Sequence, residues 1–153
     1  MNKTIGSVLW VALAVAGCTK KSGGADTTPT GGGAAAPAAP FAGTMAEAPV
    51  YEAGATVKGA VPCSRDGSGY AKFTFPAGQA LKMNVAVEAP PGACLSVSYL
   101  NANGGAVDGM MKELCVDKNA SETWDIQGLE GGSFIQVNEA VPCKGASITI
   151  AAQ

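Results

Sequence analysis

Apolar and polar residues alternate along the second half of the chain, most clearly over residues 81–88. Leu, Met, Val and Val occupy the odd positions, and Lys, Asn, Ala and Glu occupy the even ones. A period of two residues is typical of a strand with one buried face. Shorter runs predict seven further strands, at residues 55–61, 70–75, 94–101, 107–115, 123–126, 133–137 and 146–150.

Gly- and Pro-containing segments separate these strands, for example Pro-Ala-Gly at residues 76–78 and Asn-Gly-Gly at residues 103–105. Such segments are turn signals. No segment carries a convincing apolar helical stripe, so the pattern predicts an all-β domain. The favoured architecture is a small, disulfide-bonded, jelly-roll-like β-sandwich of about eight strands, and a small β-barrel is the alternative.

The first 17 residues have the order of a secretory signal peptide, with Lys3, an apolar stretch and then small residues. The stretch is shorter than the roughly 20 apolar residues that span a bilayer. The run Val15-Ala16-Gly17-Cys18 follows it directly and resembles the lipobox of bacterial lipoproteins. The resemblance implies diacylglycerol on the Cys18 thiol, cleavage before Cys18, and a further acyl chain such as palmitate on the new N-terminus. A signal peptide without lipid is the alternative.

Three acyl chains exceed the two hydrophobic signals that stable anchoring needs, so we expect attachment to the membrane through Cys18 without a span. Thr19 follows the cysteine where an Asp would favour retention in the inner membrane. The sorting rule of enterobacterial lipoproteins then implies the outer membrane, on its periplasmic or surface face. The covalent lipid is the one cofactor that we expect.

Composition divides the mature chain into two parts. Residues 18–47 are mostly Gly, Ala, Pro, Ser and Thr, which indicates a lipidated cysteine followed by a flexible linker. Such a linker of about 29 residues has a reach of about 30 Å. Residues 48–153 are the predicted β-sandwich domain, which is long enough for one core.

Charge and the absence of His restrict the chemistry. The net charge is -2 and Arg65 is the only arginine, so we expect no nucleic-acid partner. Without His, triads of the Ser-His-Asp and Cys-His kinds are excluded, and we predict a protein that is not an enzyme. Acidic pairs remain as an alternative, drawn from Asp108, Glu113, Asp117, Glu122 and Asp125. Calcium at Asp66, or at Asp117 with Asn119, is a further alternative, although no calcium-loop spacing is present.

Four cysteines remain beyond Cys18, an even number in an exported domain, which indicates two disulfides. The Asn-Gly-Gly-Ala run at residues 103–106 reads as a hairpin with a two-residue turn. Opposite residues then have numbers that add up to 209, which pairs Cys94 with Cys115 at a position where side chains approach closely. Zinc or redox use of these cysteines is the alternative, but no closely spaced pair supports it.

The remaining pair, Cys63 and Cys143, lies in two identical Ala-Val-Pro-Cys segments at residues 60–63 and 140–143. If the first and last strands are antiparallel neighbours, these cysteines meet at one corner. Pro62 and Pro142 fit strand ends, because proline lacks the N–H that continues a ladder. We therefore predict a second disulfide there and no metal site.

The aromatic residues offer one more set of candidates. Trp124 shares the side of Ile126 and is expected in the core, with a carbohydrate platform as the alternative. Tyr51, Tyr70 and Phe134 are candidates for a partner surface. The exposed loop at residues 64–69 is expected to be a turn.

Residues 69–85, an aromatic strand followed by Pro-Ala-Gly-Gln and an alternating strand, resemble the opening of bacterial pre-peptidase C-terminal domains. Residues 128–151 resemble their closing hairpin. The resemblance carries no catalytic residue and implies a jelly-roll-like module for secretion, adhesion or carbohydrate binding.

Together these features predict a lipid-anchored envelope lipoprotein that acts as a non-enzymatic interaction or structural module. Its expected partners are the lipid bilayer, through the anchor, and an envelope protein or glycan. An inhibitor of an envelope hydrolase such as lysozyme, with the 66–70 loop projecting, is one alternative. A carbohydrate- or adhesion-type accessory domain is another.

Overall fold

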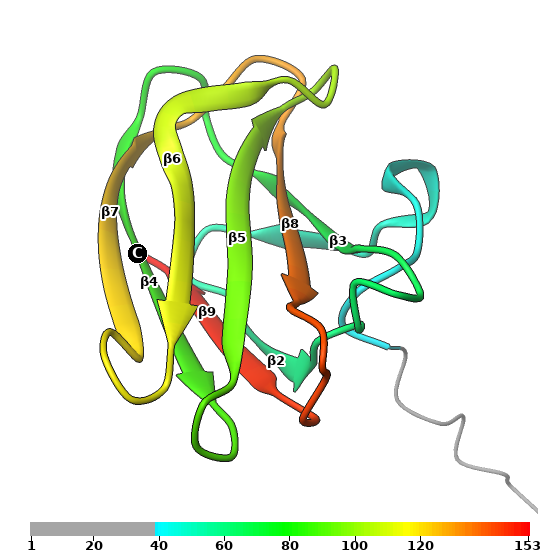
Figure 1. Ribbon diagram of the computed structural model, residues 1–153. Coiled ribbons are helices and arrows are strands. Elements are labelled where there is room, and N and C mark those ends of the chain that lie inside the picture. The colour runs from blue at the N-terminus through cyan, green and yellow to red at the C-terminus, as the bar shows by residue number, and fades with distance from the viewer. Residues whose placement is uncertain (1–38) are drawn as a thin grey trace, which may run out of the picture. The chain divides into compact units, whose positions relative to one another are not determined.

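The computed structural model of the chain describes residues 39–153, which belong to one compact unit. Nine strands in this part form two packed layers (Figure 1). A short 3-10 turn, η1 (Met45–Glu47), precedes all of them. The strands are β1 (Val50–Glu52), β2 (Thr56–Ala60), β3 (Gly69–Thr74), β4 (Ala80–Glu88), β5 (Cys94–Asn101), β6 (Ala106–Cys115), β7 (Ser121–Gln127), β8 (Ser133–Glu139) and β9 (Ser147–Ala152).

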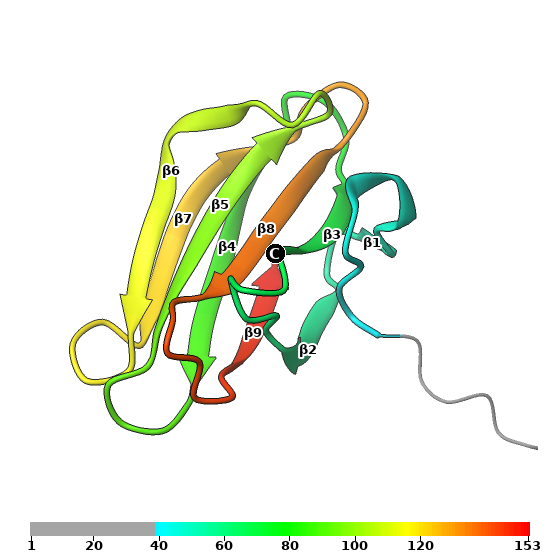
Figure 2. The ribbon, with the colours of Figure 1, turned by 45° about the vertical axis from the view of Figure 1, so that its right-hand side comes forward.

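One layer has five strands in the order β1-β3-β8-β5-β6, and the other has four in the order β2-β9-β4-β7. We call them the five-stranded and the four-stranded sheet. β1 runs parallel to β3, and the other paired strands are antiparallel. In Figure 1 β6, β5 and β8 lie in front of β7, β4 and β9, and Figure 2 shows the same two layers turned by 45°. The predicted all-β sandwich is confirmed.

The core lies between the sheets and is built from alternate residues of each strand. In β4 the odd positions from 81 to 87 are buried, as their period predicts. The inward residues of β2, β3, β5, β7, β8 and β9 belong to the same cluster, together with Leu114 of β6. In the described residues no helix is long and apolar enough to cross a membrane.

The folded unit begins earlier than the composition suggests. Residues 40–47, which we expected to belong to the linker, are part of it. Phe41 is 8% exposed and packs in the core, where a phenyl ring contributes about 2 kcal/mol by burial. Ala42 exchanges two backbone hydrogen bonds with Tyr70, of 3.0 and 2.8 Å. A Cβ on Gly69 would lie 2.9 Å from the Cβ of Phe41, so the glycine makes room for this approach.

All eight predicted strands are present, with ends within two residues of those expected, and β1 is additional. Three residues are too few to show a period. β1 forms because the chain returns along β3, where the Lys72 N–H donates to the Pro49 carbonyl over 2.9 Å. This segment covers the free edge of β3, as edge strands generally require.

The hairpin of β5 and β6 has the predicted register near its open end only. Cys94 lies opposite Cys115 and Ser98 opposite Met111, but Leu100 lies opposite Ala106. The predicted pairing of Tyr99 with Met110 is therefore wrong, because β6 carries three more residues than β5 in this interval. Gly109, with φ 74, lies in the bulge.

β2 and β9 are antiparallel neighbours, which brings the two Ala-Val-Pro-Cys segments to one corner. Glu139 ties that corner to the five-stranded sheet. Its backbone N–H donates to Pro62 O over 2.8 Å, and its carbonyl accepts from the Ser64 N–H over 2.9 Å. The structure thus joins both layers where the second disulfide was expected.

Candidate functional site

The cysteines of the domain are paired as the sequence predicts. Cys94 is bonded to Cys115, with Cα atoms 4.1 Å apart, and Cys63 is bonded to Cys143, with Cα atoms 5.7 Å apart. The predicted lipid site, Cys18, lies outside the described residues. The four paired cysteines therefore act as structural bridges.

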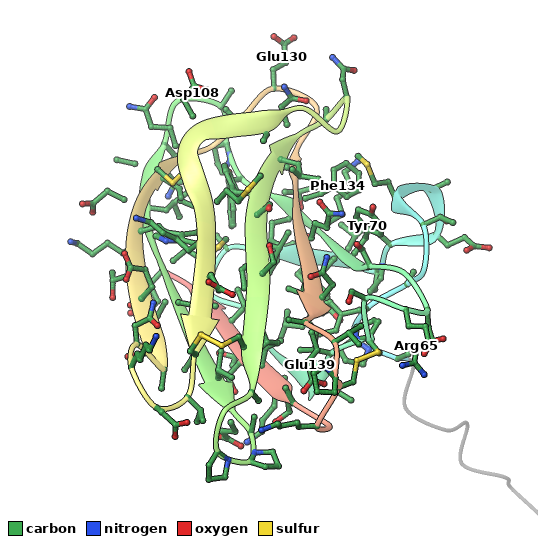
Figure 3. The ribbon with its side chains drawn as sticks, in the orientation of Figure 1. Arg65, Tyr70, Asp108, Glu130, Phe134 and Glu139 are labelled. Atoms are coloured by element: carbon green, nitrogen blue, oxygen red, sulfur yellow. A yellow bond between two sulfur atoms is a disulfide. The ribbon has the colours of Figure 1, made fainter. Side chains whose placement is uncertain are left out.

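Glu139 is a functional-looking residue that the sequence analysis missed. It is 1% exposed, and its carboxylate accepts hydrogen bonds from the N–H groups of Lys144, Gly145 and Ala146 at 2.6, 3.1 and 3.1 Å (Figure 3). These bonds satisfy the oxygen atoms of a buried polar side chain and hold the loop that carries Cys143. Its inward position in an alternating strand is the signal that could have marked it. Because it is enclosed, Glu139 holds the corner together and offers nothing to a ligand.

Two of the alternative metal sites, the cysteines and the pair Asp117 and Asn119, have no free ligand set among the described residues. Cys94 and Cys115 lie near Glu113, but both sulfur atoms are in a disulfide and supply no thiolate. Asp117 accepts a hydrogen bond from the Gly92 N–H over 2.6 Å, and Asn119 bonds the backbone of β6. The oxygens that Asp117 and Asn119 would offer to calcium therefore close turns.

The acidic residues that the sequence groups together are separated in space. Asp125 lies on the outer face of the four-stranded sheet, 3.2 Å from Lys82. Glu122 lies at the sandwich edge, 4.0 Å from Lys112 of β6. Glu113 lies on the outer face of the other sheet. The fold does not bring these three together as an acid–base pair.

The aromatic candidates differ in position. Trp124 is buried in the core, where its Nε1–H has no partner among residues 39–153, so it is not a surface platform. Tyr51 also packs inward, 5.6 Å from Phe73 between ring centroids. Phe134 points outward, but it is buried beneath Lys72, whose Nζ is 5.6 Å from the ring centroid. Of the three surface candidates, Tyr70 alone joins the polar surface described next (Figure 3).

The outer face of the five-stranded sheet carries two rows of neutral polar side chains. In the first row Tyr70, Gln136 and Ser98 lie side by side on β3, β8 and β5. In the second row Asn138 lies beside Ser96. We call this surface the amide–hydroxyl platform and define it by Ser68, Tyr70, Ser96, Ser98, Gln136 and Asn138.

Hydrogen bonds fix the platform at its β3 side. The Gln136 amide nitrogen donates to Ser68 Oγ over 2.9 Å and to Tyr70 Oη over 3.1 Å. The Asn138 amide nitrogen donates to the same Ser68 Oγ over 3.3 Å. Four residues from the 64–69 loop, β3 and β8 are thus held in one network. Such a network orders its groups before any ligand arrives.

The borders of the platform are of a different kind. On one side, the first row borders on Phe134 and Leu100, which are almost fully buried although they point outward. On β6, Met111 is 62% exposed and lies beside Ser98, and Glu113 lies beside Ser96. Apolar and charged side chains therefore frame a neutral polar centre.

A second candidate is an apolar groove at the open edge of the sandwich, between β6 and β7. It has a volume of about 310 Å³, and its lining includes Tyr99, Met110, Ile126 and Leu129. Burial raises the pKa of the Tyr99 phenol, and a hydrogen bond with Ser133 partly offsets this rise. The Tyr99 hydroxyl donates to the Gln127 carbonyl over 3.2 Å. The Tyr99 hydroxyl is therefore already bonded, and Asp125 at the groove is paired with Lys82, so the groove offers mainly apolar surface.

Comparison with known proteins shows a fold and no family. The sequence matches no protein-family model and no curated protein. Among solved structures, the chain is similar to the pre-peptidase C-terminal domain of collagenase from Bacillus anthracis, with a TM-score of 0.50 and 13% identity over 70% of this chain and 95% of that one. This similarity agrees with the sandwich fold that residues 69–85 suggested.

Two further structures match more loosely. One is PliG from Aeromonas hydrophila, a periplasmic inhibitor of g-type lysozyme, with a TM-score of 0.39 and 15% identity over 69% of this chain and 98% of that one. The other is the enzymatically active domain of tailspike protein 4 of bacteriophage CBA120, with a TM-score of 0.41 and 13% identity. The match covers 73% of this chain and 18% of that one. Similarities with TM-scores below 0.5 say nothing of function, which must be argued from the site.

Proposed function

We propose that the protein is a non-enzymatic binding module of the bacterial cell envelope, anchored by lipid on Cys18, and that the amide–hydroxyl platform is its contact surface. The observation that carries the proposal is the ordered network of Gln136, Ser68, Tyr70 and Asn138 on an outer sheet face. Neutral polar side chains that are fixed in place bind a ligand without first losing their own freedom.

The anchor rests on the run that ends at Cys18, directly after an apolar stretch too short to span a membrane. The residue that follows is Thr19 and not Asp, which supports a location in the outer membrane. The folded unit begins by Pro40, and the Tyr51 hydroxyl donates to the Pro40 carbonyl over 3.3 Å. The predicted linker would therefore enter the folded unit at the edge of the five-stranded sheet that is formed by β1 and β3.

The anchor is tested by metabolic labelling of the full-length protein with a fatty-acid analogue. The variant Cys18→Ala should lose the label and retain its signal peptide, whereas the neighbouring variant Thr19→Ala should be labelled and processed normally. Label retained on Cys18→Ala would disprove the anchor.

The contact surface is tested by photo-crosslinking in native membranes. A crosslinking residue at position 96 lies on the platform, and one at position 149 occupies a similarly half-buried place on the four-stranded sheet. We expect specific products from position 96 only. Equal capture from both positions would show that the platform is not the contact surface. Products that form only from positions 65 or 66, with a lysozyme as partner, would favour an inhibitor instead.

A further inference from the structure

The platform keeps unused hydrogen-bonding capacity that faces outward. Ser68 Oγ accepts two hydrogen bonds and Tyr70 Oη accepts one, so both hydroxyl hydrogens are left to donate. Gln136 and Asn138 each use their amide nitrogen, which leaves two carbonyl oxygens to accept. Among residues 39–153 neither oxygen has a protein hydrogen bond.

The other half of the platform adds hydroxyl groups. Ser96 and Ser98 of β5 form no side-chain hydrogen bond within the described residues, and each can donate and accept. The platform thus mixes donors and acceptors over two rows. Strand spacing of about 4.8 Å makes the first row, from β3 to β5, about 10 Å long, and the two rows lie about 7 Å apart.

Charge narrows the class of ligand. On β3, β5 and β8 the one charged side chain that points outward is Lys72, and it lies over Phe134. A polyanion such as a nucleic acid needs several free cations, which this surface lacks. A metal ion would need more than the single carboxylate of Glu113. The residues that dominate protein–protein binding energies are most often Trp, Tyr and Arg in desolvated pockets, whereas the centre of the platform consists of Ser, Gln and Asn. The composition therefore favours a ligand other than a protein.

We infer, building on the proposed function, that the amide–hydroxyl platform is a binding site for an uncharged stretch of polysaccharide. Sugar hydroxyls donate and accept at the same time, as the platform groups do. The Tyr70 ring supplies an apolar surface with a polar tip at one end of the first row. A neutral, extended ligand of many hydroxyls matches this surface in charge and in hydrogen bonding.

The inference is tested on the protein from residue 19 onward, which contains the whole compact unit. The probes are purified peptidoglycan sacculi, chitohexaose and maltohexaose, with co-sedimentation for the first and calorimetry for the others. We expect saturable binding to at least one. Binding to sacculi and chitohexaose would indicate a cell-wall glycan, and binding to maltohexaose alone would indicate another polysaccharide.

Three variants locate the site. Gln136→Met keeps the side-chain volume and should weaken glycan binding at least tenfold. The pair Ser96→Ala and Ser98→Ala, which breaks no side-chain bond, should weaken it at least threefold. Thr149→Val on the four-stranded sheet should bind like the wild type.

Absence of binding to all three probes, or unchanged binding by the Ser96→Ala/Ser98→Ala protein, would overturn the glycan inference. The envelope module would survive that result if crosslinking from position 96 still captured a protein. If positions 96 and 149 gave the same crosslinked products, the platform would fail as the contact surface, whatever the result with the glycan probes.

Discussion

The outer faces of the two sheets share strand geometry but carry different side chains. On the four-stranded sheet, charged residues are exposed and joined in pairs, Lys58 with Glu88 at 2.9 Å and Lys82 with Asp125 at 3.2 Å. On the five-stranded sheet the centre is neutral, and its groups are half-buried and linked across strands. Ser98 there is only 5% exposed.

The two outer faces therefore differ in how their side chains interact with water and with one another. Exposed ion pairs keep water at a surface and contribute little to stability. A fixed network of amides and hydroxyls is instead costly to order, and its free donors and acceptors all point one way. The four-stranded sheet thus has the character of an ordinary solvated face, whereas the five-stranded sheet carries the platform that we propose as the contact surface.

The largest expected effect on stability comes from a disulfide that one sheet has at its edge strand and the other sheet lacks. The Cys94–Cys115 disulfide ties the edge strand β6 to β5 on the platform side, whereas the edge strand β7 is held without a covalent bond. Replacing both cysteines with Ala should lower the free energy of unfolding by about 3 kcal/mol, because the bridge closes a loop of 21 residues.

Urea unfolding of the wild type and of the Cys94→Ala/Cys115→Ala variant, both with the Cys63–Cys143 bridge oxidised, measures this loss. In the variant, backbone amides of β6 should exchange their hydrogens faster than those of β7. Equal exchange in the two edge strands would mean that the bridge has no special role on the platform side. The Thr123→Val protein, changed on the outer face of β7, serves as the matched control.

The next effect comes from the network itself. Gln136→Met removes two side-chain hydrogen bonds, to Ser68 and Tyr70. It should destabilise the fold by 1–2 kcal/mol, at about 1 kcal/mol for each half-buried bond. Thr123→Val removes one exposed bond, to Asn84, of 2.7 Å, and should change stability by less than about 0.5 kcal/mol. Similar losses in both variants, measured by urea unfolding, would remove the energetic distinction between the faces.

The sequence predicts the platform only in part. Alternation already places residues 70, 96, 98, 134 and 136 on the non-core side of their predicted strands, whereas residue 138 lies beyond the predicted end of its strand. Their assembly depends on β8 lying between β3 and β5, which no local pattern encodes. Nor does alternation tell a buried outward residue from an exposed one, because burial of Phe134 depends on Lys72 from another strand.

The Cys94–Cys115 pair shows a correct prediction that rests on a partly wrong geometry. The sequence predicts a turn at residues 104–105, but the chain turns earlier, with the Asn101 N–H bonded to the Gly105 carbonyl over 2.8 Å. That turn alone would displace the pairing by three residues. The bulge around Gly109 restores it, so the two departures cancel at the disulfide. Turn type and bulges are set by local backbone detail that residue spacing does not report.

A smaller effect is expected where the two faces carry lysines in different roles. Lys72→Ala uncovers Phe134 and removes a cation–π contact, which should cost about 1 kcal/mol. Lys58→Ala removes an exposed ion pair with Glu88 and should cost less than about 0.5 kcal/mol. Thermal unfolding of both variants compares them. A larger loss for Lys58→Ala would show that packing does not distinguish the faces.

The smallest effect is expected from neutralising a whole ion pair on the four-stranded sheet. Lys82 and Asp125 have side chains 69% and 85% exposed, so water screens their attraction. The double variant Lys82→Gln/Asp125→Asn should unfold within about 0.5 kcal/mol of the wild type. In 1 M NaCl, where the screening length is about 3 Å, the remaining difference should vanish. Glycan binding by this variant should stay at the wild-type level, because the pair lies on the opposite side of the sandwich from the platform. A loss of binding without a loss of stability would instead make the charged face part of the recognition surface.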